Sequence, residues 1–103
     1  MLARTWSGRA PAAKADAYFE FLKETGIKDY LATPGNRGVL VLRKVLGDEA
    51  EFLLVSFWES ETAIRAFAGE DMEKAHYYPA DKDYLLNFAP TADHYDVLFQ
   101  SSR

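Results

Sequence analysis

Two histidines, His76 and His94, are the side chains in this sequence that are best suited to move protons near neutral pH. His94 begins a predicted strand, which is a rigid mount, so it is the first candidate for a catalytic base and His76 is the second. Each histidine also has a plainer interpretation. His76 could be a solvated surface residue, and His94, between Asp93 and Asp96, could be a strand-end residue that donates to a carboxylate.

Aromatic residues make up 15% of the chain and are the natural walls of a pocket for a flat ligand. A phenolic substrate held between such rings and deprotonated by a histidine becomes an electron-rich anion that can pass an electron to oxygen. That chemistry needs no flavin or metal, so we predict no cofactor. The same rings could instead fill the core or a subunit interface. The candidate substrate-binding residues are Trp6, Trp58, Phe67, Tyr77 and Tyr78.

Other kinds of site are not supported by the residue types present. The chain has no cysteine, and its two histidines lack the H-x-x-x-H or H-x-H spacing of metal ligands, so we predict no metal site. The glycines of Gly35-Asn36-Arg37-Gly38 precede a predicted strand rather than a helix, which argues against a phosphate-binding loop.

Length and charge limit the class of protein. With 103 residues the chain is predicted to form one domain, residues 1–103. A net charge of -4 argues against a nucleic-acid partner or an anionic membrane surface. The sequence has no apolar segment of membrane-spanning length and no signal-peptide core, so we expect a cytoplasmic protein.

Residues 37–59 predict a hairpin that is apolar on both faces, with strands at 39–42 and 52–58 and a turn at 47–49. Side chains of a strand alternate between two faces, and here both sets are apolar. One set is Leu53, Val55 and Phe57, and the other is Phe52, Leu54 and Trp58. Because a chain of this length has helices for only one face, we predict that a second copy covers the other, which makes a homodimer.

The remaining pattern completes an α+β plan. It predicts a strand at 2–9, a helix at 12–25 ended by Gly26, a connection at 29–38 and a helix at 61–68 capped by Ser60. A short helix at 70–77 and a surface loop at 77–83, with Asp81 in a solvated turn, should follow. The chain should end with a strand or arm at 84–88, a strand at 94–100 and a frayed end at 101–103. This order is the ferredoxin-like split βαβ arrangement, βαββαβ, with one extra short segment.

The sequence resembles the antibiotic biosynthesis monooxygenase domains of the dimeric α+β barrel superfamily. The resemblance lies in Phe57-Trp58-Glu59-Ser60, in the helix after it and in His94-Tyr95-Asp96-Val97, and it spans residues 3–97. It implies that two ferredoxin-like sheets close into a barrel across a dimer and that each subunit has a pocket between its sheet and helices. It also implies a range of activities, from cofactor-free oxygenases of quinols and anthrones to haem-degrading enzymes.

This chain shares one of three sequence features with the haem-degrading branch of that superfamily. Ala75-His76 matches its iron-ligating Ala-His pair, but its first-strand Asn and its helical Trp have no counterpart near Trp6 or Phe67. The first functional hypothesis is therefore a cofactor-independent monooxygenase acting on an aromatic, anthrone or quinol-type molecule. The second is a dimer that binds a small ligand without turnover, and the third is a haem-binding or haem-degrading protein.

Overall fold

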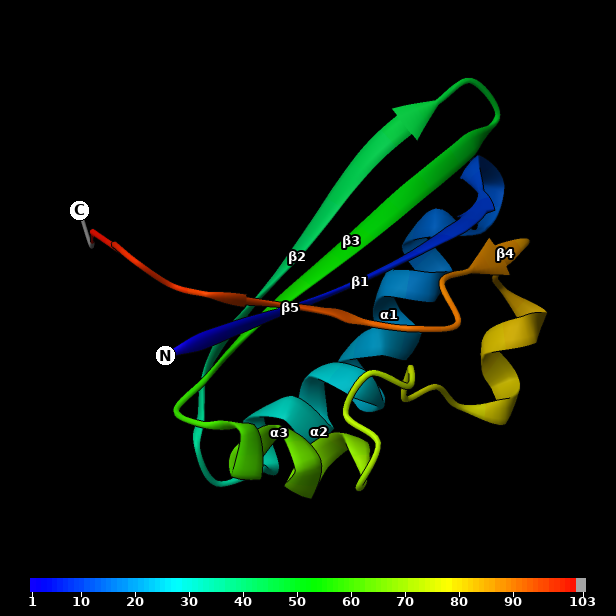
Figure 1. Ribbon diagram of the computed structural model, residues 1–103. Coiled ribbons are helices and arrows are strands. Elements are labelled where there is room, and N and C mark those ends of the chain that lie inside the picture. Colours follow the sequence, from blue (N-terminus) through cyan, green and yellow to red (C-terminus); the bar gives the residue numbers. More distant parts are fainter. Residues whose placement is uncertain (102–103) are drawn as a thin grey trace.

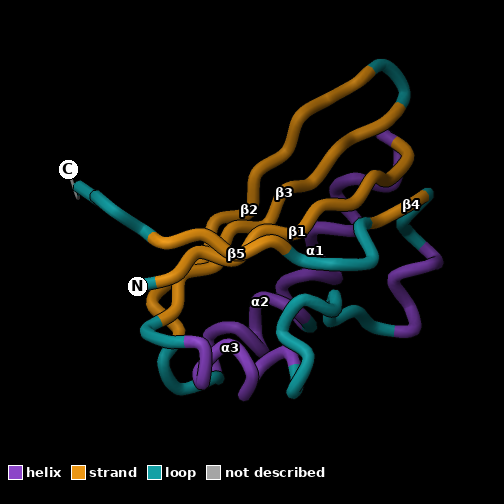
Figure 2. Tube along the Cα trace, in the orientation of Figure 1, coloured by secondary structure: helices purple, strands orange, loops and turns teal. Residues whose placement is uncertain are grey.

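In the computed structural model, which describes residues 1–101, helices pack on one face of a single antiparallel sheet (Figures 1 and 2). The strands are β1 (Leu2–Pro11), β2 (Asn36–Leu46), β3 (Glu49–Trp58), β4 (Asn87–Phe88) and β5 (Asp93–Asp96). The α-helices are α1 (Ala15–Glu24), α2 (Gly26–Ala32) and α3 (Glu61–Ala68), and two 3-10 helices are η1 (Ala12–Lys14) and η2 (Pro79–Asp83).

The strand order confirms the ferredoxin-like α+β prediction. The sheet runs β2-β3-β1-β4, and β5 also pairs with β1. One edge of β1 pairs with β3 over its full length. Its other edge pairs with β5 over residues 2–5 and with β4 at Gly8 and Arg9. β1 is therefore the central strand, and its side chains reach the middle of both faces.

The two faces of the sheet are covered very differently. Phe52, Leu54 and Trp58 of β3 are buried beneath the helices. On the opposite face Leu53, Val55 and Phe57 are only half-buried, and the neighbouring β2 side chains are exposed. The helices thus cover one face of a sheet that is apolar on both, as the hairpin pattern predicted.

The prediction that Gly26 ends the first helix was wrong. The helical region begins with η1, continues as α1 to Glu24, and resumes at Gly26 as α2. Gly26 has none of the positive φ of a helix-ending glycine; it is buried, and a Cβ there would lie 3.8 Å from Leu22. Thr25 makes the break instead, with its hydroxyl donating to the Phe21 carbonyl at 2.8 Å. The chain stays helical because α2 carries Tyr30 into the core.

The short helix predicted at 70–77 does not form. Residues 71–74 form a single turn instead, with the Lys74 amide donating to the Asp71 carbonyl at 3.2 Å, and an isolated bridge joins Lys74 to Thr91. The Ala75 amide donates to the Pro90 carbonyl at 3.0 Å, and the Ala92 amide donates to the Glu73 carbonyl at 2.8 Å. Pairing with a distant part of the chain therefore replaces the local helix.

Two further predictions near the C-terminus also changed. The expected surface loop contains η2, which buries Asp81 to 4% exposure, so the prediction of a solvated turn was wrong. The final strand is shorter than predicted because β1 begins at Leu2 and offers β5 no partner beyond Asp96. Leu98 and Phe99 extend past it into solvent. Of the residues expected to fray, 102 and 103 lie outside the described part of the chain.

Candidate functional site

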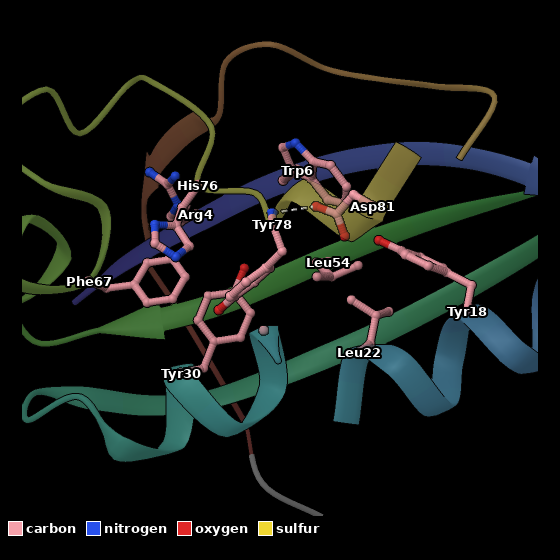
Figure 3. Close-up of a pocket in the computed structure, with 11 residues that line it drawn as sticks. Arg4, Trp6, Tyr18, Leu22, Tyr30, Leu54, Phe67, His76, Tyr78 and Asp81 are labelled. Atoms are coloured by element: carbon pink, nitrogen blue, oxygen red, sulfur yellow. Dashed lines mark hydrogen bonds between the residues drawn. The ribbon is translucent and has the colours of Figure 1, made fainter. Parts of the chain in front are cut away.

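A narrow pocket lies between the helix-facing side of the sheet and the helices (Figure 3). Its volume is about 20 Å³, which is room for about one water molecule. The lining comes from β1, β3, α1, α2, α3, the segment that leads into η2, and η2 itself. The lining residues are Arg4, Trp6, Tyr18, Leu22, Gly26, Tyr30, Leu54, Phe67, His76, Tyr78 and Asp81.

Arg4 places a guanidinium group at one end of this pocket. The residue is 2% exposed, and burial lowers its pKa from the ordinary value for arginine. No ion pair within residues 1–101 involves Arg4. Its partners are neutral: Nη2 donates to the Lys74 carbonyl at 3.1 Å, and Nη1 donates to the Met72 carbonyl and to His94 Nε2, the latter at 3.0 Å. The positive charge is held in place but is not neutralised.

The pairing of residues 73–75 with residues 90–92 explains how Arg4 is held. Backbone groups of an extended chain alternate between its two edges. Glu73 and Ala75 use one edge to pair with residues 90–92. The Lys74 carbonyl is thereby left on the other edge, and the guanidinium of Arg4 donates both to it and to the carbonyl of Met72 in the preceding turn.

Aromatic rings form the wall beside Arg4. Tyr30 stacks on Phe67 with ring centroids 4.5 Å apart, and Phe67 packs against His76 at 4.8 Å. Tyr78 meets His76 edge to face at 5.3 Å, and the Arg4 guanidinium lies 5.9 Å from the Phe67 centroid. In Figure 3 the His76 ring lies beside the Arg4 guanidinium and Phe67. A cation and a titratable imidazole therefore share one end of an aromatic pocket.

The other end of the pocket is formed by Asp81 and Tyr18. Asp81 Oδ2 accepts a hydrogen bond from the Tyr78 amide at 2.8 Å, and burial raises the pKa of the Asp81 carboxyl group. The Tyr18 side chain points toward Asp81 (Figure 3). Burial, and after it the charge of Asp81, raises the pKa of Tyr18, which keeps its hydroxyl group protonated.

Tyr78 contributes its ring to the pocket, but its hydroxyl group is engaged elsewhere. That hydroxyl donates to Asp29 Oδ2 on α2. Burial, followed by this bond to Asp29, raises the pKa of Tyr78. Tyr78 is therefore a wall that is anchored to a helix rather than a proton donor to a ligand.

The structure brings four of the seven predicted site residues to the pocket, namely Trp6, Phe67, His76 and Tyr78. The other three lie outside its lining. Trp58 is fully buried behind the wall, 5.6 Å from the Phe67 ring, and its Nε1 donates to Ser56 Oγ at 2.8 Å. Tyr77 is half-exposed and packs on Phe88 at 5.0 Å.

His94 lies next to Arg4, with its Nε2 as the acceptor of the Arg4 hydrogen bond. The acceptor role assigns the proton of the neutral ring to Nδ1. Burial, and after it the charge of Arg4, lowers the pKa of His94 and favours that neutral form. The ring borders a shallow groove with Met72 and Glu73 rather than the aromatic pocket.

Sequence reasoning missed the residues that give the pocket its polarity. Strand alternation places Arg4 on the same face as Trp6, which is a signal that could have identified it. Tyr30 and Tyr18 carry a weaker signal, because each is a large residue on the buried side of a helix. Asp81 had no signal, because its burial depends on the path of the irregular segment around η2.

Two kinds of feature are absent from the part of the chain that the structure describes. Within residues 1–101, no three His, Cys, Asp or Glu side chains gather in a way that could hold a metal ion. No helix in that same range has the length and apolar character required to cross a membrane.

Solved structures similar to this one share its fold at low sequence identity. A protein from Bacillus cereus, described as a proposed antibiotic biosynthesis monooxygenase, has 18% identity and a TM-score of 0.68, over 99% of this chain and 97% of that one. The haem degrader MhuD from Mycobacterium tuberculosis, with two haems bound in its active site, has 19% identity and a TM-score of 0.68, over 99% and 100%. A protein of unknown function from Nitrosomonas europaea has 16% identity and a TM-score of 0.67, over 99% and 93%.

Comparison with protein families gives a more specific result than these structures do. A comparison with curated protein sequences gives no match. The family model for antibiotic biosynthesis monooxygenase matches residues 9–77, which is well over half of the chain and includes β2, β3, α3 and the pocket residues Phe67 and His76. The chain therefore belongs to the antibiotic biosynthesis monooxygenase family.

Proposed function

We propose that this protein is a cofactor-independent monooxygenase that acts on a flat aromatic molecule of the anthrone or hydroquinone type. The observation that supports this most strongly is Arg4, a buried cation without a carboxylate partner, beside His76 in an aromatic pocket. Such a site favours the deprotonated form of a ligand. The aromatic anion produced there is the species that can reduce oxygen without a metal or flavin.

His76 is the proposed proton acceptor, because its ring lines the pocket and a neutral imidazole is an effective base near neutral pH. Arg4 stabilises the negative charge that develops on the substrate oxygen. His94 acts through Arg4 as a positioning residue, since it accepts one of the guanidinium hydrogen bonds. The rings of Phe67 and Trp6 enclose the substrate and exclude water.

The overall reaction balances with oxygen as the only oxidant. An anthrone methylene group loses two hydrogens and gains one oxygen atom to become a carbonyl group. The second atom of O₂ leaves as water together with those two hydrogens. The first step is transfer of a proton from the methylene carbon to His76, which leaves an enolate oxygen facing Arg4.

Substrate entry requires side chains to move, because the pocket volume of about 20 Å³ is far smaller than an aromatic ligand. His76 and Tyr78 come from the irregular segment between α3 and η2 rather than from the sheet. They are the part of the wall that we expect to open, while Arg4 and Trp6 stay fixed on the central strand.

The uncovered face of the sheet supports a homodimer. Leu40 and Leu42 of β2 are 49% and 45% exposed, and they stand opposite Val55 and Leu53 in the sheet register. Burying a large apolar side chain contributes about 1.5–3 kcal/mol, and a two-fold axis would cover the same face on both copies. A cytoplasmic location and the lack of a nucleic-acid partner stay predictions.

The test is oxygen uptake by the pure protein with anthrone in air and in the presence of a metal chelator. We expect one O₂ consumed for each anthraquinone formed, and a rate that falls roughly 10²–10⁴-fold in His76→Gln. Binding without any oxygen uptake would replace the enzyme with the alternative of a ligand-binding module. A rate that His76→Gln leaves unchanged would remove His76 from its proposed role.

Haem binding is the second candidate, favoured by the similarity to MhuD and by the position of His76 in the pocket lining. The residues fit haem only in part. His76 could ligate iron and Arg4 could pair with a propionate, but the pocket, with a volume of about 20 Å³, would have to open further for a porphyrin than for a smaller aromatic molecule. Titration with haem, followed by the Soret band in the wild type and in His76→Ala, distinguishes this candidate from the first.

A further inference from the structure

Asp81 places a second buried polar group in the pocket, at the end away from Arg4 (Figure 3). The residue is 4% exposed, and no ion pair within residues 1–101 involves it. A buried carboxyl group normally requires a cation or several hydrogen-bond donors. Asp81 therefore has more hydrogen-bonding capacity than the surrounding protein uses.

The two oxygens of the Asp81 carboxyl group have different environments. Oδ2 accepts the Tyr78 amide hydrogen bond and so caps the start of η2. Oδ1 has no hydrogen-bond donor from residues 1–101. Within residues 1–101, no side-chain oxygen that is sealed from solvent lacks a partner, so Oδ1 keeps some solvent exposure, and Asp81 is one of the residues that line the pocket. The capping role explains one oxygen and leaves the other free for a ligand.

The surroundings of Asp81 give the pocket two unlike polar ends. In Figure 3, Arg4 and His76 lie at one end and Asp81 lies with Tyr18 at the other, with the rings of Tyr78 and Tyr30 between them and Leu54 and Leu22 on the Asp81 side. The Arg4 end suits an oxygen that carries negative charge. The Asp81 end offers a hydrogen-bond acceptor, with the Tyr18 hydroxyl close by.

We propose that Asp81 is the specificity-determining residue of this pocket and accepts a hydrogen bond from a hydroxyl or amino group at the end of the ligand remote from Arg4. This inference rests on the proposed function for its ligand class, a flat aromatic molecule with an ionisable oxygen. A ligand without the second donor would desolvate Oδ1 and give it no partner. Sites built to bind a hydroxyl group reject analogues that lack it for this reason.

The test compares two ligands of matched shape, 1-naphthol and 1,5-dihydroxynaphthalene, by isothermal titration calorimetry under argon. We expect the wild type to bind the diol about tenfold more tightly or better, as for a hydrogen bond to a charged group. In Asp81→Asn the preference should fall to about threefold or less. Asparagine can still accept the Tyr78 amide bond, so the cap is retained. Asp83→Asn is the matched control, since Asp83 is an exposed residue of the same 3-10 helix.

Equal affinities of the wild type for the two compounds would overturn the inference, and so would a preference that survives in Asp81→Asn. Binding of neither compound would also overturn it. The wild-type comparison alone decides the matter if Asp81→Asn does not fold. Preference for the diol without oxygen uptake from anthrone would support this inference and refute the proposed enzyme. Oxygen uptake from anthrone combined with equal affinities for the two naphthols would support the proposed enzyme and refute the inference about Asp81.

Discussion

Replacement of Arg4 by methionine removes the pocket's cation and keeps a side chain of similar length. Arg4 donates hydrogen bonds to the carbonyls of Met72 and Lys74 and to His94 Nε2. Each buried carbonyl left without a donor costs about 1–3 kcal/mol. Burial lowers the pKa of Arg4, which means that burying its charged form costs free energy. Methionine carries no charge and avoids that cost, so part of the loss of stability is offset. We expect a net loss of stability of about 1–3 kcal/mol.

The effect on turnover should be larger than the effect on stability. A buried donor aimed at a developing oxyanion contributes roughly 10²–10³-fold in kcat. We therefore expect kcat for anthrone oxidation by Arg4→Met to fall by about that factor at a temperature where the variant is fully folded. The assay is oxygen uptake at saturating anthrone, with folding checked by circular dichroism.

Arg43→Met is the matched control, because Arg43 is exposed and pairs with Asp16 on the surface at 2.9 Å. An exposed ion pair of this kind contributes little to stability, and Arg43 is not part of the pocket lining. Its kcat should match the wild type. If folded Arg4→Met keeps kcat within about threefold of the wild type, the reasoning that assigns the oxyanion to Arg4 is wrong.

His94, the uncovered face of the sheet and the Tyr78–Asp29 hydrogen bond each give a further test. The pKa of His94 is lowered from 6.5, so the unfolded chain binds more protons than the folded one between that value and the folded-state pKa, and stability decreases as the pH is lowered through this window. Chemical denaturation from pH 7 to pH 5 should show a smaller loss of stability in His94→Gln, and an equal loss would contradict this. Val55→Asp should convert the proposed dimer to monomers in sedimentation while Thr62→Asp on α3 does not, and a monomeric wild type would refute the proposed dimer. Tyr78→Phe removes the bond to Asp29, so thermal unfolding should show a loss of about 1 kcal/mol with kcat unchanged, and a large fall in kcat would instead make the hydroxyl catalytic.

Local patterns in the sequence predicted most of the fold. The two apolar sets along β3 indicated a sheet with two apolar faces, and Ser60 was correctly identified as the cap of α3, where its Oγ accepts the Ala63 amide at 3.2 Å. Such features depend on residues close together in the chain. Gly26 failed as a helix end because its backbone conformation is set by packing rather than by residue type.

Sequence analysis identified pocket residues only where the residue type itself suggested a role in binding or proton transfer. Phe67 and His76 line the pocket, but Arg4 and Asp81 were missed because charged residues are usually exposed. Their burial depends on segments far away in the sequence. Residues 90–92 pair with Glu73 and Ala75 and so position the neighbouring carbonyls that bind Arg4. The path of the chain into η2 buries Asp81 in the pocket lining. Strand alternation does place Arg4 on the same face as Trp6, but no local pattern indicates its carbonyl partners or the burial of Asp81.

The most direct test of the central claim, that Arg4 holds a bound aromatic anion, is the pKa of a phenol inside the pocket. Titration of bound 4-nitrophenol, followed by its phenolate absorbance, should give a pKa at least about one unit below that of the free phenol, equivalent to about 1.4 kcal/mol. In Arg4→Met the bound pKa should return to the solution value or rise above it. A bound pKa that is not lowered in the wild type, or a lowering that persists in Arg4→Met, would contradict the account.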